Sequence, residues 1–252
     1  MTPDSNNPTA QDEKPKFFGR RKGRTIRKAK SFLLDNFLPK VRIEPTAGLF
    51  LPSCFTRPEI RRYALEIGFG DGAHLAALAQ SRPDTGFIGV EVYKNGVANL
   101  LSLMTGLKDG DAENLSQEIV LEKGRTDNIR IYDDDVRLLF ASLPDACFDK
   151  IYLLFPDPWP KKKHADRRFV NPHNLTELAR LLKKGGILQI ATDHPVYKSW
   201  VLHTMAQNKD FIWTAKCSDD WRNPPADWFE TKYQRKAVKE GRRPVFFEYQ
   251  RI

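Results

Sequence analysis

The sequence ALEIGFGDGAHLAALA, residues 64–79, contains three consecutive patterns. Its first four residues are mostly apolar and predict a short strand, and the next five place a glycine at every second position. The remaining seven are rich in alanine and leucine, which is typical of a helix. A strand, a glycine-rich turn and a helix in this order indicate a domain of the α/β class.

The same alternation continues along the chain. Strands are predicted at residues 86–91, 129–132, 150–155 and 187–191, and helices at residues 95–104 and 174–183. Gly185 and Gly186 are expected to stop the second of these helices, and residues 108–127 form a polar connection. The alternation predicts a doubly wound, mostly parallel sheet with its ligand at the carboxyl ends of the strands. Residues 211–213 and 245–249 are expected to add an antiparallel pair at the C-terminal end.

The length of 252 residues suits one α/β domain with a tail. Residues 1–15 contain almost nothing to bury and are interpreted as a disordered lead. Residues 14–30 form a basic run that includes Phe17 and Phe18, which is either an arm that orders on RNA or a solubilising tail. We therefore divide the chain into residues 1–30, the lead and basic arm, and residues 31–252, a single domain.

The formal net charge of +9 favours a polyanionic partner, and nucleic acid is the first candidate. A membrane is disfavoured, because the apolar segments are far too short to span a bilayer. Cys54, Cys147 and Cys217 are odd in number and lack metal-ligand spacing, so neither a disulfide framework nor a zinc site is expected. Residues 1–13 have no apolar core of a signal peptide, and we expect a cytoplasmic protein. The sequence does not determine the oligomeric state, and a monomer is favoured.

Acidic residues stand at the ends of three successive predicted strands, namely Glu66, Glu91 and Asp135. Glu91 lies roughly twenty residues after the glycine turn, where an acid commonly accepts hydrogen bonds from both ribose hydroxyls. Asp135 offers an acceptor for an exocyclic adenine amine. The turn, which includes Gly68 and Gly70, has a spacing that does not exclude a nicotinamide cofactor.

Charge separates the candidate ligands. A carboxylate as close to the turn as Glu66 would repel a pyrophosphate, whereas it would attract the ammonium or sulfonium group of a cationic cofactor. The acidic rim therefore favours S-adenosylmethionine over NAD. A divalent metal bound by residues 133–135, three consecutive aspartates, is a further alternative. It is disfavoured because alternate side chains of an extended segment point apart.

The sequence FPDPWPK, residues 155–161, follows the strand predicted at residues 150–155. Pro156 and Pro158 flank Asp157 and stiffen the backbone on which this acid stands. Trp159 offers a ring for stacking, and the basic residues that follow offer charge for phosphate. These basic residues are Lys161, Lys162, Lys163, His164, Arg167 and Arg168. The combination indicates a site that takes in one base of a nucleic acid, and a proline-rich turn followed by a solvated basic loop is the alternative.

Several motifs together resemble the bacterial tRNA (guanine-N7-)-methyltransferase family. They are LEIGFGDG at residues 65–72, GVEV at residues 89–92, LFPDPWPK at residues 154–161 with His164 and Arg167-Arg168, ATD at residues 191–193 and TKY at residues 231–233. The FPDPW element is highly specific, and the resemblance runs from about residue 20 to the C-terminus. It implies a class I, Rossmann-like methyltransferase domain that uses S-adenosylmethionine and acts on the variable-loop guanosine at tRNA position 46.

With this resemblance, the cofactor-binding residues are predicted to be Glu66, Gly68, Gly70, Glu91, Asp135 and Asp157. Asp157 is also the predicted catalytic residue, and no metal is expected. The substrate-binding residues are predicted to be Lys161, Asp193, Thr231, Lys232, Tyr233 and Gln234. Two positions depart from the family pattern, since Gln234 replaces a usual Glu and Asp166 replaces a common Lys. Either Asp134 or Asp135 matches the family acid, and Asp135 is preferred because Val136 resembles the small apolar residue that usually follows.

The chemistry of the target atom defines the expected mechanism. Guanine N7 has an in-plane lone pair and no proton, so its methylation needs no general base, only positioning and electrostatics. Asp157 is expected either to stabilise charge that develops on the purine or to accept from its N1–H and 2-amino groups. The base is expected to leave its tertiary contacts and to stack on Trp159 or Tyr233. The alternatives are another RNA methyltransferase with a different target and a non-catalytic RNA-binding module with the same fold.

Overall fold

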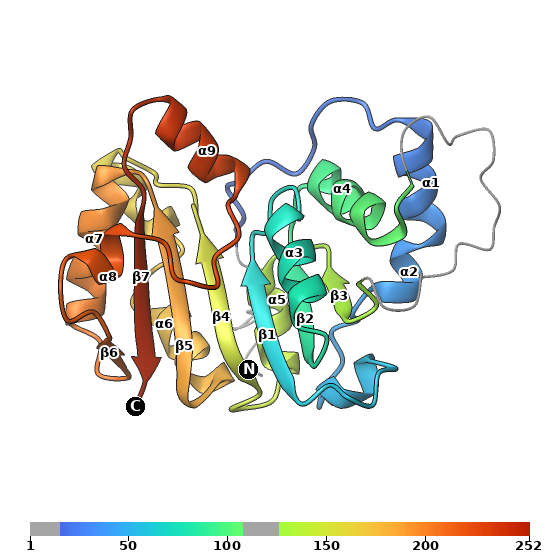
Figure 1. Cartoon of the computed structure of the whole chain (residues 1–252), viewed down its shortest axis with the longest axis horizontal. Helices are drawn as coiled ribbons and strands as arrows, with labels where there is room; N and C mark the ends of the chain where they lie inside the picture. Colours follow the sequence, from blue (N-terminus) through green and yellow to red (C-terminus); the bar gives the residue numbers. More distant parts are fainter. Residues whose placement is uncertain (1–15, 108–125) are drawn as a thin grey trace, which may run out of the picture.

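The computed structural model describes residues 16–107 and 126–252, and in these ranges the strands form one seven-stranded sheet (Figure 1). The strands are β1 (Arg62–Ile67), β2 (Thr85–Val90), β3 (Ile129–Tyr132), β4 (Phe148–Leu154), β5 (Leu182–Thr192), β6 (Phe211–Trp213) and β7 (Val245–Arg251). Their order is β3-β2-β1-β4-β5-β7-β6, with β1 to β5 parallel and β7 antiparallel to both of its neighbours. The predicted mostly parallel sheet with an antiparallel C-terminal pair is confirmed.

Helices connect the strands. The α-helices of the described ranges are α1 (Lys28–Asn36), α2 (Leu38–Val41), α3 (Ala73–Ser81), α4 (Lys94–Thr105), α5 (Val136–Leu139), α6 (Pro172–Leu181), α7 (Pro195–Ala206), α8 (Asp219–Arg222) and α9 (Lys232–Lys239). Short 3-10 helices include η1 (Leu51–Cys54), η3 (Phe140–Ser142) and η4 (Lys162–Arg167). No helix within residues 16–107 and 126–252 has the length and apolar character needed to cross a membrane. The lead at residues 1–15 and most of the connection expected at residues 108–127 lie outside the described residues.

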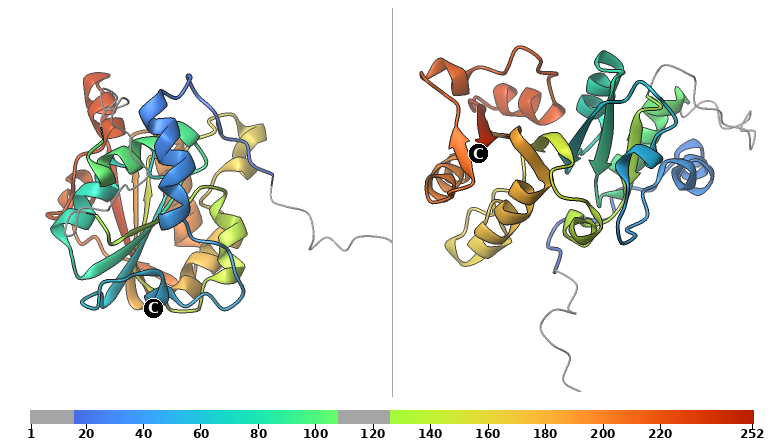
Figure 2. Two further views of the ribbon diagram at one scale, coloured as in Figure 1. Left: turned by 90° about the vertical axis from the view of Figure 1, so that its right-hand side faces the viewer. Right: turned by 90° about the horizontal axis from the view of Figure 1, so that it is seen from below.

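Helices cover both faces of the sheet (Figure 2), and strand side chains enter two apolar cores, one on each face. In β4, Ile151 and Leu153 enter the first core, whereas Tyr152 and Leu154 enter the second. Helices α5, α6 and α7 contribute to the first core, and α1, α3 and α4 contribute to the second. Because both faces of the central strands are buried, these strands are apolar runs in the sequence.

One predicted helix end is wrong. Gly185 and Gly186 do not stop α6, which already ends at Leu181, but lie inside β5. Pairing between β5 and β4 begins at Leu182, and its register has shifted by the time it reaches Ile187. The extra residues form a bulge in which Gly185 adopts a φ of +82°. The glycine pair therefore deforms a strand, and the helix ends without it.

The site is positioned by a reversal of strand order between β1 and β4. From β1 the sheet extends through β2 to β3, and from β4 it extends through β5 in the opposite direction. In open α/β sheets the crevice outside the carboxyl ends of the strands at such a reversal is the usual ligand site. The residues that follow β1, β2, β3 and β4 therefore converge at one end of the sheet.

The described part of the N-terminal arm, residues 16–27, has no helix or strand and lies beside this end of the sheet (Figure 1). It is attached to the start of α4, where the backbone N–H of Lys94 donates to the Arg21 carbonyl at 3.1 Å. The backbone N–H of Gly23 also donates to Oδ1 of Asn95 at 3.0 Å. Helix α1 begins at Lys28, so the domain boundary expected at residue 30 falls within this helix.

Candidate active site

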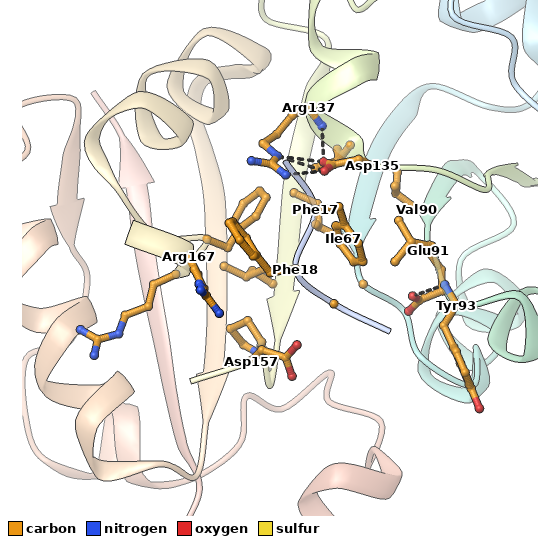
Figure 3. Close-up of a pocket in the computed structure, with 18 of the residues that line it drawn as sticks. Phe17, Phe18, Ile67, Val90, Glu91, Tyr93, Asp135, Arg137, Asp157 and Arg167 are labelled. Atoms are coloured by element: carbon orange, nitrogen blue, oxygen red, sulfur yellow. Dashed lines mark hydrogen bonds and ion pairs between the residues drawn. The ribbon is translucent and has the colours of Figure 1, made fainter. Parts of the chain in front are cut away.

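A pocket of about 490 Å³ lies beyond the carboxyl ends of β1, β2, β3 and β4 (Figure 3). The predicted site residues in its lining are Gly68, Gly70, Glu91, Asp135, Asp157, Lys232 and Tyr233. The predicted residues that do not line it are Glu66, Lys161, Asp193, Thr231 and Gln234. The structure therefore brings together acids from three strand ends and two residues of α9.

The loop after β1 and the acid after β2 hold each other in place. Gly68 and Gly70 adopt φ values of +71° and +64°, a region that favours glycine. Glu91 accepts a hydrogen bond from the backbone N–H of Gly70 at 2.8 Å and one from Tyr93 at 2.9 Å. Burial raises the pKa of Glu91, and the backbone hydrogen bonds act against this shift. The orientation of this carboxylate in the pocket is thus set by two backbone groups.

Asp135 is the N-cap of α5 and accepts from the backbone N–H of Arg137 at 3.0 Å. Its carboxylate also pairs with the guanidinium of Arg137 at 2.5 Å (Figure 3). Asp134 lines the pocket too, but its side chain is 38% exposed and pairs with Arg21 at 2.8 Å. Asp135 is the more buried of the two and the one fixed by a helix start, and its contact with the cofactor stays a prediction.

Glu66 lies behind the glycine loop and outside the pocket lining. Its side chain is 2% exposed, and Oε2 lies 2.9 Å from Nδ1 of His74 on α3. The His74 ring packs edge-on against Tyr152, with ring centroids 5.5 Å apart. Sequence reasoning missed this histidine. Its place on the helix that follows the glycine turn was the available signal, because that helix packs back on the strand carrying Glu66.

Asp157 stands on a loop with unusual backbone at both ends. Phe155 and Trp159 have φ values of +51° and +40°, which non-glycine residues rarely adopt. The value at Phe155 was not expected, because a following proline favours extended backbone. The guanidinium of Arg168 donates to the carbonyls of Pro158 at 3.2 Å and Trp159 at 3.0 Å, which holds the loop in this conformation. Burial raises the pKa of Asp157.

The structure corrects the expectation that Arg168 offers its charge to phosphate. This side chain is 5% exposed, bonds to loop carbonyls and lies over the Trp200 ring at 4.5 Å. Arg167 does line the pocket, with its guanidinium 4.4 Å from the centre of the Phe18 ring and 5.0 Å from that of Trp159. Lys161 is exposed at the start of η4, and Asp166 lies in the pocket lining.

Residues 16–20 of the N-terminal arm line the pocket, which sequence reasoning did not predict. Figure 3 shows Phe17 and Phe18 between Asp135 and Asp157. Phe18 packs edge-on against Trp159 with ring centroids 6.2 Å apart, and Arg137 donates to the Lys16 carbonyl at 3.1 Å. Lys16 and Arg137 are 121 positions apart in the chain. The aromatic residues in the basic run indicated a contact surface, but nothing local specified where the run would fold.

Helix α9 brings Lys232 and Tyr233 to the pocket. The Tyr233 ring stacks with Phe155 at a centroid distance of 6.3 Å and an interplanar angle of 25°. A Cβ on Gly70 would lie 3.1 Å from the same tyrosine ring, so Tyr233 closely covers the glycine loop. Asp193 instead accepts from the Arg242 guanidinium at 2.6 Å. The described residues contain no group of three or more His, Cys, Asp or Glu side chains arranged to hold a metal ion.

The fold and this pocket define a Rossmann-like methyltransferase. A family model described as "Putative methyltransferase" matches residues 61–246. A solved 16S rRNA methyltransferase, KamB, shares the fold with a TM-score of 0.51 at 16% identity, and the match covers 78% of this chain and 90% of that one.

The chain belongs to the tRNA (guanine-N(7)-)-methyltransferase family. The relative of that name from Rhodospirillum rubrum is 40% identical over 250 residues, which cover 97% of this chain and 91% of the relative. The relative from Paramagnetospirillum magneticum is 39% identical, with 97% and 96% covered. The relative from Agrobacterium fabrum is 42% identical, with 92% and 94% covered. The family resemblance of the sequence motifs is thus confirmed over almost the whole chain.

Proposed function

We propose that this protein transfers a methyl group from S-adenosylmethionine to N7 of the guanosine at position 46 in the variable loop of tRNA. Membership of the tRNA (guanine-N(7)-)-methyltransferase family supports the tRNA substrate and the N7 atom. The observation in the structure that supports the reaction is a single pocket that Glu91 and Asp157 enter from opposite sides of the strand reversal. Position 46 rests on the resemblance of the sequence motifs to the family.

The donor groups of the pocket suit S-adenosylmethionine. Glu91 has oxygens for the ribose hydroxyls, Asp135 has an acceptor for the adenine amine, and Gly68, with nothing within 4 Å of where a Cβ would stand, leaves the backbone accessible. Carboxylates on this side of the pocket would repel the pyrophosphate of a dinucleotide and attract a cation. When bound, the donor supplies an electrophilic methyl group on a positively charged sulfur.

Asp157 is the group placed to act on the purine. The N7 atom carries no proton, so the residue does not need to remove one. Its carboxylate stabilises the positive charge that develops on the ring, or accepts hydrogen bonds from the N1–H and 2-amino groups of guanine. The strained loop and the Arg168 clamp restrict the movement of this acid. The site is therefore organised before the base arrives, which lowers the cost of reorganisation.

Positive side chains around the pocket suit a nucleic acid. Arg167 and Lys232 line it, and Lys161 is exposed on the loop beside it. With the net charge of +9, these side chains attract the phosphate backbone of tRNA. Because the proposed substrate is a tRNA, we propose the cytoplasm as the compartment of this protein.

The test is methyl transfer to an unmodified tRNA transcript with labelled S-adenosylmethionine, followed by nucleoside analysis for 7-methylguanosine. A matched transcript with adenosine in place of guanosine 46 is the control. We expect 7-methylguanosine in the first transcript and none in the second. Label at another nucleotide would favour a different RNA methyltransferase, and no label would favour a non-catalytic RNA-binding module. Thermal stabilisation by NAD but not by S-adenosylhomocysteine would contradict the cofactor assignment.

A further inference from the structure

Residues 223–231, which precede α9, are attached to the domain through Asp227 (Figure 1). The carboxylate of Asp227 pairs with the guanidinium of Arg82 and lies 3.7 Å from Nζ of Lys150. Lys150 in turn lies 3.3 Å from the carboxylate of Glu248. Asp227 thus connects the segment directly to the end of α3 and to β4, and Lys150 extends this network to β7.

The next residue, Trp228, is partly buried and packs on the second core. Its ring lies against Phe246 of β7 with ring centroids 4.8 Å apart, and against His74 of α3 with centroids 5.2 Å apart. His74 is the residue that bonds to Glu66 behind the glycine loop. The indole therefore rests on a surface that is continuous with the support of the cofactor loop.

Trp228 also reaches forward to α9. Its Nε1 donates a hydrogen bond to Oε1 of Gln234 at 2.5 Å. An indole N–H is only a donor, so the amide of Gln234 must turn its oxygen towards it. The backbone N–H of Gln234 donates to Oγ1 of Thr231 at 3.0 Å, which caps the helix. Lys232 and Tyr233, the two residues of this turn that line the pocket, lie between these two fixed positions.

We propose that Trp228 is a positioning residue for the substrate-facing turn of α9, and that Gln234 acts as its hydrogen-bond acceptor instead of contacting the tRNA. This inference rests on the proposed function. Gln234 does not line the pocket, and its side-chain oxygen is already bonded. Trp228 thereby fixes Tyr233 over the glycine loop, where the Tyr233 ring is in close contact with Gly70.

The proposal accounts for the glutamine at this position. A carboxylate would accept from the indole N–H at least as strongly as an amide oxygen does, so a Glu and a Gln can both fill this role. The two would not be equivalent in direct contact with guanine, because the amide adds donors where the carboxylate has only acceptors. An exchange between Gln and Glu therefore separates a positioning role from a direct contact.

The experiment is a double-mutant cycle in the full-length protein with Trp228→Phe, Gln234→Met and both together. Phenylalanine keeps the ring but loses the N–H, and methionine keeps the length but loses the acceptor. We expect each single variant to raise the KM for tRNA about three- to tenfold, and the double variant to be no worse than the poorer single one. The kcat and the KM for S-adenosylmethionine should stay within about twofold of wild type, because the lost bond positions only the substrate-facing turn.

Two further variants complete the test. Gln234→Glu should keep the KM for tRNA within about twofold of wild type, because the acceptor is retained. Trp221→Phe is the matched control, since Trp221 is also partly buried but packs with Trp213 and Phe247 on the opposite face of the sheet, against the first core. It should leave the KM for tRNA unchanged.

Additive effects in the cycle would overturn the inference, as would a change of more than about fivefold in either direction for Gln234→Glu. If Trp228→Phe does not fold, as judged by its thermal transition, Gln234→Met and Gln234→Glu still separate the two roles. Failure of the proposed function has a different signature. If the proposed function fails, the wild-type protein itself forms no 7-methylguanosine. If only the positioning role fails, the wild-type protein is active and the mutant cycle gives additive effects.

Discussion

The two sides of the pocket are built in different ways. Beyond β1 to β3, the predicted cofactor residues follow directly on strands and bond to backbone groups near them, as Glu91 does with Gly70. Beyond β4, Asp157 follows the strand closely, but distant segments complete the pocket around it, namely Tyr233 from α9 and Phe18 from the N-terminal arm. The first side depends on local geometry and the second on long-range packing. Substitutions on the two sides should therefore affect donor binding and tRNA methylation differently.

The largest effect is expected for Asp157→Ala. Loss of a preorganised charge beside the reacting base should lower kcat about 10²- to 10³-fold, while the Kd for tRNA changes by less than about threefold. Single-turnover methylation and a filter-binding measurement separate these quantities. Near-normal turnover in the variant would remove Asp157 from the mechanism.

On the other side of the pocket, Glu91→Ala should mainly weaken donor binding. The change removes the acceptor for the Gly70 and Tyr93 N–H groups and, in the proposed site, for the ribose, so the KM for S-adenosylmethionine should rise about 10- to 100-fold. The kcat at saturating donor should fall much less. Glu44→Ala is a control, because that side chain is 66% exposed and pairs only with Arg42 among the described contacts. An unchanged KM for the donor in Glu91→Ala would contradict the assignment of this side.

The pH dependence of the reaction should report on the Asp157 side. Burial raises the pKa of Asp157, so this carboxyl takes up its proton at a higher pH than an exposed aspartate does. In the proposed mechanism the charged form of Asp157 is the active one. At saturating donor, kcat should therefore be full above the raised pKa and fall about tenfold per pH unit below it. Asp157→Asn should lose this acid limb, and an unchanged limb in that variant would assign the titration to another group.

The same contrast explains what the sequence could predict. The strands that are buried on both faces are apolar runs in the sequence, and acids follow directly on these runs. The sequence could therefore predict β1 to β4 and place Glu91, Asp135 and Asp157 after the ends of their strands. The sequence could not predict that the arm folds over the strand ends, because the contact between Lys16 and Arg137 joins residues far apart in the chain.

Three local patterns were also ambiguous. The glycines at residues 185 and 186 predicted the end of a helix, but they lie in β5 at a bulge where its pairing with β4 changes register. Its place in a basic run predicted an exposed charge at Arg168, but this side chain is buried against loop carbonyls. Glu66 was predicted to contact the cofactor, and the helix that packs behind it supplies His74 as its hydrogen-bond partner. In each case the deciding neighbour belongs to another element, which is β4 for the glycines, the loop after β4 for Arg168 and α3 for Glu66.

The smallest effect is expected for Lys161→Ala on the tRNA side. Lys161 is exposed and lies outside the pocket lining, so under the proposed function we expect its charge to act on the phosphate backbone and not on the methyl-transfer step. The Kd for tRNA should rise about two- to fivefold at moderate salt, and the slope of log Kd against log salt should fall by about one. Lys184→Ala is the matched control, because Lys184 is equally an exposed lysine but stands near the start of β5, at the opposite end of the sheet. A salt slope equal to that of wild type in Lys161→Ala would exclude the phosphate contact. A reduced slope in Lys184→Ala as well would show that the net charge, and not a contact beside the pocket, governs the attraction.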